Sequence, residues 1–185
     1  MLLTGYRFGD TFVTALTQIN GYTRRSTMEK QQIIDELKML LDGDPWHAAS
    51  LKETLNGISG ERAALKLPGT HSIWELAGHI AGWNNVWAER LRGNPVSEPA
   101  DGNFPEEKVV AEVAWQGLQT QLADSFANLI SAIALHSESE FAERFEDNDY
   151  TLSFFLHGAV RHNVHHAAQI ALLKSATAKH ETAAA

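Results

Sequence analysis

The chain contains no cysteine, and this absence excludes several kinds of site at once. Disulfides, thiolate metal ligands, iron–sulfur clusters and cysteine nucleophiles all need that side chain, so any metal here would have nitrogen and oxygen ligands. No run of apolar residues is long enough to cross a bilayer. Residues 1–20 lack a basic stretch followed by an apolar one, so we expect no signal peptide and a cytoplasmic protein.

Positive charge is also scarce. The formal net charge is -8, and the lysines and arginines are scattered along the chain rather than clustered. A nucleic-acid surface needs a basic patch, so we expect neither DNA nor RNA as a partner. Histidine, by contrast, is abundant, with nine among 185 residues. Any function proposed for the chain has to account for this excess.

Proline occurs only five times, and the apolar residues recur mostly at helical spacing, which predicts an all-α fold. The best-defined helix start is the capping box formed by Ser72 and Glu75. Residues 28–178 are expected to form one bundle domain, with residues 179–185 as a frayed tail. Residues 1–27 are an N-terminal extension, which either precedes a natural start at Met28 or packs as an arm on a partner subunit. We expect helices over residues 28–41, 46–57, 72–92, 105–135 and 150–177.

The last of these helices carries the main functional signal. Its core-facing stripe, at alternating spacings of four and three, places histidines and a glutamine where leucines are normally found. His162 and His166 are four residues apart, so both project from one helix face. This is the spacing by which a helix binds a metal ion with two imidazoles.

Two ligands on one helix do not complete a metal site, so a third has to come from a facing helix. His79 is the best candidate, because it lies between Leu76 and Trp83 on an inward stripe of the helix over residues 72–92. Burying three neutral imidazoles without partners would cost free energy, which a bound metal would remove. The alternative is that these are core histidines bonded to backbone or water.

Four further residues are candidates around this site. His165 is the main rival to His166 as the second ligand on the last helix. Gln169 could bond a ligand imidazole or cap a polar layer, and Trp83 lies one turn beyond His79. His47 follows a helix break and could line the mouth of a pocket. The remaining histidines are expected at the surface or have no partner at a useful spacing: His71, His136, His157 and His180.

Three histidine ligands leave at least one coordination position open, since no carboxylate lies on these stripes as an obvious fourth ligand. Glu75 is one turn before His79 but is already engaged by its capping box. Closed four-ligand sites are typical of structural zinc, whereas catalytic sites keep a position for water or substrate. The sequence therefore indicates Lewis-acid chemistry.

Two segments together resemble a known family. Residues 71–83 (HSIWELAGHIAGW) and 156–174 (LHGAVRHNVHHAAQIALLK) are similar to the two hallmark helices of the DinB/YfiT-like superfamily. The resemblance covers about residues 28–176 and implies a four-helix bundle with up-down-down-up connectivity, often dimeric. It also implies that His79, His162 and His166 are metal ligands. His165 stands where many relatives have an aromatic residue, and Ala168 where glycine is frequent, and neither change should disturb the ligands.

Characterised relatives in that family include thiol S-transferases, isomerases and metal-dependent hydrolases. The resemblance therefore implies an enzyme whose divalent metal, zinc or nickel, activates a low-molecular-weight thiol or a water against a small electrophilic substrate. Thiol transfer is preferred slightly over hydrolysis, because the sequence places no clear general base beside the ligands. One alternative is a non-catalytic, stress-related protein that binds a metal or small ligand. Another is a helical dimerisation module whose histidines are structural.

Overall fold

The computed structural model describes residues 29–106 and 110–181, and in this part of the chain the predicted all-helical fold is confirmed. A single isolated bridge, between Arg144 and Thr151, is the only β-type pairing among the described residues. None of the helices described is both long enough and apolar enough to cross a membrane. The elements are α2 (Glu29–Asp42), α3 (Leu51–Leu55), α4 (Gly60–Ala64), α5 (Ile73–Leu91), α6 (Glu112–Ala134), the 3-10 turn η1 (Glu138–Ala142) and α7 (Leu152–Glu181).

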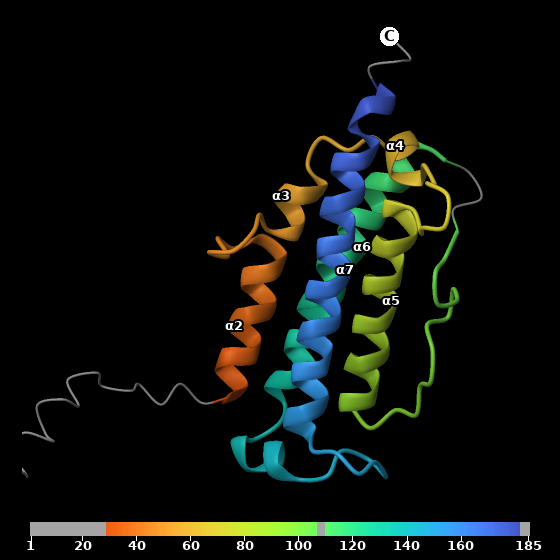
Figure 1. The fold of residues 1–185 in the computed structure, drawn as a ribbon. Coiled ribbons are helices and arrows are strands. Elements are labelled where there is room, and N and C mark those ends of the chain that lie inside the picture. Colours follow the sequence, from red (N-terminus) through yellow and green to blue (C-terminus); the bar gives the residue numbers. More distant parts are fainter. Residues whose placement is uncertain (1–28, 107–109, 182–185) are drawn as a thin grey trace, which may run out of the picture.

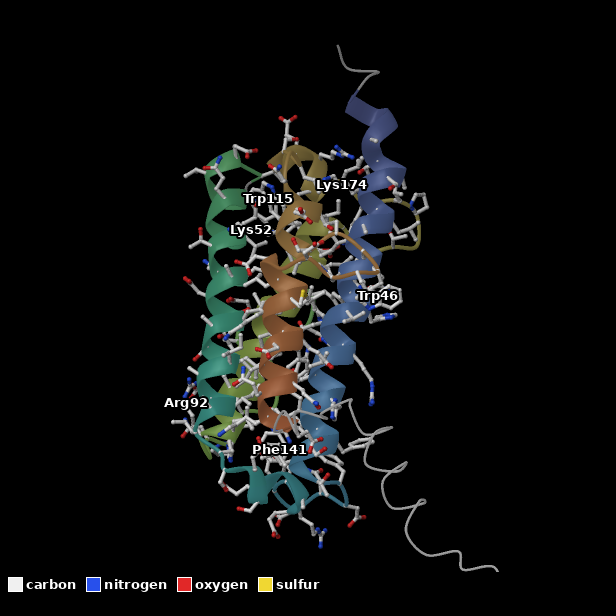
Figure 2. The ribbon with its side chains drawn as sticks, turned by 90° about the vertical axis from the view of Figure 1, so that its left-hand side faces the viewer. Trp46, Lys52, Arg92, Trp115, Phe141 and Lys174 are labelled. Atoms are coloured by element: carbon white, nitrogen blue, oxygen red, sulfur yellow. The ribbon has the colours of Figure 1, made fainter. Side chains whose placement is uncertain are left out.

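Four long helices form the body of the molecule. α5 packs most extensively against α6 and also against α7, while α2 closes the ring against α6 and α7. In the view of Figure 1, α2 and α7 run upward and α5 and α6 run downward. The short helices α3 and α4 lie at the upper end, and η1 lies at the lower end. Figure 2 shows α2 lying between α6 and α7.

The core forms where the apolar stripes of the four helices meet. Buried side chains come from each of them, including Leu37 of α2, Ile80 of α5, Phe126 of α6 and Ile170 of α7. Trp115, which is fully buried, donates its indole N–H to the carbonyl of Ile58 at 2.7 Å. That bond gives the indole a partner inside the core and ties α6 to the segment before α4.

Some predicted helix bounds were wrong. The helix expected over residues 46–57 is only Leu51–Leu55, because Ser50 and Glu53 form a capping box that starts it later. The helix expected from Pro105 begins at Glu112. The last helix begins at Leu152 and continues past Thr177 to Glu181. Thr177 is fully buried, and Arg62 donates to its hydroxyl from α4 at 3.1 Å, which holds this end of α7 against the bundle.

Two other predictions concern parts of the chain that are not described. The N-terminal extension over residues 1–27 lies outside the described residues, and so does the last part of the expected tail, residues 182–185.

After α5, the described part of the connection to α6, up to residue 106, runs back along α5 (Figure 1). Residues 99–105, called the strap below, pack on α5 at two glycines. A Cβ placed on Gly78 would lie 2.6 Å from Cγ of Pro105, and one on Gly82 would lie 2.8 Å from Cβ of Pro99. Any side chain at either position would push the strap away, so glycine is what permits this close approach.

Candidate metal centre

The two helices that present the histidines are fixed in position by their ends and by their packing. In α5, the Ser72 hydroxyl accepts from the Glu75 N–H at 3.1 Å, and the Glu75 carboxylate accepts from the Ser72 N–H at 2.7 Å. This capping box sets where the helix begins, and therefore the face on which His79 emerges. α7 packs against α5, so its own inward face meets that residue.

His79, His162 and His166 lie together between α5 and α7. One ring nitrogen from each lies within 4.8 Å of the other two, and Nε2 of His79 is 2.9 Å from Nε2 of His162. Three nitrogens bound to a tetrahedral zinc ion at about 2.0–2.1 Å would stand about 3.4 Å apart. The separation of 2.9 Å and the upper limit of 4.8 Å lie on either side of that value, so these three residues could hold a metal ion.

Neighbouring acceptors assign the proton positions on two of the rings. Nδ1 of His79 lies 2.6 Å from the backbone carbonyl of Asn103, and Nδ1 of His166 lies 2.6 Å from Oε1 of Gln169. Because both neighbours are oxygen acceptors, each Nδ1 carries the hydrogen. Nε2 of each ring is then left with a free lone pair. A hydrogen-bonded Nδ1–H is the arrangement in which proteins usually hold a metal-binding histidine.

His162 differs from the other two, because its Nδ1 is buried and has no hydrogen-bond partner among the described residues. With the His79 proton on Nδ1, the His162 Nε2 atom faces a lone pair at 2.9 Å. If His162 carries its proton on Nε2, its buried Nδ1 lone pair is unpaired. If the proton is on Nδ1, two lone pairs face each other. A cation bound by both Nε2 atoms would give these facing lone pairs a partner and would place the His162 hydrogen on Nδ1, so the close approach of the two Nε2 atoms fits a metal.

Burial keeps all three rings neutral. It lowers the pKa of His162 to about 3, with further contributions from His166, His79 and His165. Burial is also the largest cause of the lowered pKa of His79 and of His166. A histidine must be neutral to bind a metal ion, so the chain presents its ligands in the correct protonation state near neutral pH. No carboxylate among the described residues belongs to the group.

Aromatic rings surround the histidines. Phe104 of the strap stacks on the His79 ring, with centroids 4.1 Å apart and an interplanar angle of 5°. Trp87 meets the His162 ring edge-on at 4.9 Å. The His79 ring is buried and the other two rings are half-buried. This burial lowers the local dielectric, which strengthens electrostatic interactions among the three rings.

The other predicted site residues fall into two sets. Gln169 bonds His166, and Trp83 donates its indole N–H to Oδ1 of Asn103 at 2.8 Å, so both lie in the surroundings of the three histidines. His165 is exposed and contacts the His166 ring with centroids 4.9 Å apart, outside the group of three. His47 lines a groove between α2 and α7 that none of the three histidines lines.

Sequence reasoning missed the contribution of the strap and of His71. Asn103 acts through its backbone carbonyl, which no residue pattern reveals, and Phe104 lies in a loop without periodicity. His71 is exposed as expected, yet its ring stacks on Phe104 at 3.6 Å. The available signal was the pair Gly78 and Gly82, four residues apart inside a helix, a pattern that indicates close approach of another segment.

These features define a helical-bundle protein with an open group of three neutral histidines that could hold a metal ion. The model of the DinB superfamily matches residues 46–170, and the chain belongs to this family. The match includes His79, His162 and His166 together with the strap, and leaves out α2. No curated protein and no solved structure matches the chain.

Proposed function

We propose that this protein is a metal-dependent enzyme in which the three histidines hold a divalent transition metal with an open coordination position. The site would activate a thiol or a water for transfer to, or hydrolysis of, a small electrophilic substrate. The observation that carries the proposal is the convergence of three ring nitrogens within 4.8 Å of one another. Two of the three rings also have their Nδ1–H bonded to an oxygen acceptor. Zinc and nickel are the metals we favour, since imidazole suits both.

The chain's own residues would divide the work. When bound, the metal would supply Lewis acidity, which lowers the pKa of a thiol or water that coordinates it. His79, His162 and His166 would hold the metal, and the Asn103 carbonyl and Gln169 would orient the His79 and His166 rings. Phe104 and Trp87 would limit access of water to the centre.

Thiol transfer is favoured over hydrolysis by what surrounds the histidines. Glu75, the carboxylate one turn before His79, is 3% exposed, caps α5 and forms an ion pair with Lys66 at 2.8 Å. It is therefore not available as a general base for a water. A thiol with a lowered pKa ionises without such a base, so we propose a low-molecular-weight thiol as co-substrate.

The first experiment is elemental analysis of the purified full-length protein beside three single variants. We expect about one equivalent of metal in the wild type, and loss of most of it in His162→Ala and His166→Ala. His165→Ala is the matched control, because it removes the adjacent histidine and should keep the metal. Chelation should lower the melting temperature of the wild type but not that of His162→Ala, because a ligand bound only to the native state stabilises it. A wild type without metal after incubation with zinc and nickel would overturn the proposal.

Activity separates the enzyme from the alternative, a non-catalytic stress-related protein that binds a metal or small ligand. The metal-loaded protein should transfer a low-molecular-weight thiol to small electrophiles, and His162→Ala should not. Release of the hydrolysed electrophile without thiol would favour hydrolysis instead. One equivalent of slowly exchanging metal with no turnover on either panel would favour the binding protein.

A further inference from the structure

The strap connects to the metal centre through one backbone carbonyl. The Asn103 carbonyl accepts the Nδ1–H of His79 at 2.6 Å, which directs the lone pair of Nε2 toward the other two histidines. The side chain of the same residue accepts from the Trp83 indole at 2.8 Å. The acceptor is therefore held from α5 itself, one turn beyond the histidine it orients.

A stack of three rings fixes the plane of His79. Phe104 lies nearly parallel to the His79 ring, at 4.1 Å and 5°, and nearly parallel to the His71 ring, at 3.6 Å and 9°. Rotation of the His79 ring out of this plane would break the contact with Phe104 and the bond to the Asn103 carbonyl together. One conformation of the ring satisfies both.

The strap is held against α5 on both sides of this contact. Pro99 packs on Gly82 and Pro105 packs on Gly78, at distances that leave no room for a Cβ. Just beyond the strap, Glu106 accepts from Nζ of Lys66 at 2.6 Å, and Lys66 also pairs with Glu75 of α5. The position of Asn103 and Phe104 thus depends on two glycines that themselves touch none of the ligands.

We infer that the strap is a positioning element of the metal centre: Asn103 and Phe104 set the tautomer and the plane of His79, and Gly78 and Gly82 permit them to do so. The inference rests on the proposed metal site. It assigns no contact with metal or substrate to these residues. Changes in neighbours that orient a metal-binding histidine typically cost about 10- to 100-fold in metal affinity.

The first test reads the tautomer of His79 in the full-length, metal-free protein, through the 15N chemical shifts of its imidazole nitrogens. We expect the wild type to carry the proton on Nδ1 alone. In Gly82→Ala the strap is pushed away, so the His79 ring loses its fixed acceptor, the Asn103 carbonyl. In Phe104→Ala the ring loses its stacking partner and can rotate out of the plane in which it reaches that carbonyl. In both variants the proton should therefore distribute over both nitrogens. A His79 spectrum unchanged in both variants would overturn the inference.

The second test compares zinc affinity by competition with a chromogenic chelator. Gly82→Ala and Phe104→Ala should bind zinc about 10- to 100-fold more weakly than the wild type while keeping its helical circular dichroism. Gly158→Ala is the matched control, since Gly158 is also a helix glycine, lies on α7 one turn before His162, and has nothing within 4 Å of its Cβ position. It should bind zinc as the wild type does.

The two tests keep this inference separate from the proposed function. A wild type that binds no zinc would overturn the metal-dependent enzyme, and the tautomer of His79 would still decide whether the strap orients that ring. Equal zinc affinity in Gly82→Ala, Phe104→Ala and the wild type would overturn the positioning role even if the enzyme is metal-dependent. Should Gly82→Ala lose its helical signal, Phe104→Ala decides, because it removes a ring without forcing the backbone apart.

Discussion

At the scale of single residues, the candidate centre depends on which ring nitrogens carry protons. The structure pairs Nδ1 of His79 and of His166 with oxygen acceptors and leaves Nδ1 of His162 buried without one. Burial also disfavours the charged form of all three rings. Both effects concern the metal-free protein, so they can be measured before any metal or substrate is identified.

The metal-free protein should lose stability as the pH falls from about 6.5 toward 3. In the unfolded chain His162 takes up a proton near the ordinary histidine pKa of about 6.5. In the folded protein burial and the neighbouring histidines hold its pKa at about 3. Between these values the unfolded state binds more protons, so acidification favours unfolding. Urea midpoints at pH 7, 6, 5 and 4 should fall less steeply in His162→Leu than in the wild type, and equal slopes would contradict the assignment.

Gln169 should matter for metal affinity through its side-chain oxygen. It accepts from Nδ1–H of His166 at 2.6 Å, so Gln169→Leu removes the acceptor and should weaken zinc binding about 10-fold or more. Gln169→Glu keeps an acceptor and adds negative charge, so it should restore the affinity to the wild-type level or above it. Chelator competition measures both, and equal loss in the two variants would point to packing rather than to this hydrogen bond.

At the scale of the elements, the sequence predicted those features that neighbouring residues determine, such as where a helix begins and which side chains share one of its faces. The start of α5 follows from Ser72 and Glu75, and the shared face of His162 and His166 follows from helical spacing. Even the third histidine, on a different helix, could be chosen from its place on an inward stripe. The structure brings these three side chains together, although no local pattern states that α5 and α7 are neighbours.

What sequence reasoning missed is set by contacts between distant segments. Residues after Pro105 showed a helical pattern, yet α6 begins only at Glu112. Pro105 itself belongs to the strap, because it packs against Gly78 of α5. Sequence reasoning also missed the Asn103 carbonyl, because its role depends on where the backbone passes and not on the identity of the side chain.

A buried polar chain links three helices beside the candidate centre. Asn163 of α7 donates to Asn84 of α5 at 2.9 Å, Asn84 donates to Ser125 of α6 at 3.3 Å, and all three side chains are at most 1% exposed. Asn84→Ala removes the middle member and should destabilise the protein by about 1–3 kcal/mol, because its buried neighbours lose a partner.

The control for this change is the next residue. Asn85 is exposed and accepts only from Asn128 among the bonds described, so Asn85→Ala should change stability by no more than about 0.5 kcal/mol. Urea denaturation at pH 7 measures both. Similar losses of stability in the two variants would mean that the buried polar chain contributes no more to stability than an exposed hydrogen bond does.

At the scale of the whole molecule, one face is more apolar than a solvated surface requires. A groove between α2 and α7 is lined by Met39, Trp46, Val160 and Val164 among others, and Trp46 is 96% exposed. Figure 2 shows Trp46 projecting beside α7. We propose that a second copy of the chain covers this face in a homodimer, as expected from the family resemblance. Contiguous exposed apolar surface is typical of such interfaces.

Light scattering after size exclusion tests the dimer directly. The wild type should have about twice the monomer mass of 20.4 kDa, and the double variant Trp46→Ser, Val164→Glu should be monomeric with its metal retained. Val113→Ser, which replaces another exposed apolar residue, at the start of α6 and outside the groove, is the control and should stay dimeric. Asp35, Glu36 and Asp44 also line the groove, so the two copies would repel each other there, and moderate salt should tighten the dimer by screening. A wild type that is monomeric at all concentrations and salt levels would overturn the homodimer without affecting the three-histidine site, whose residues come from one chain.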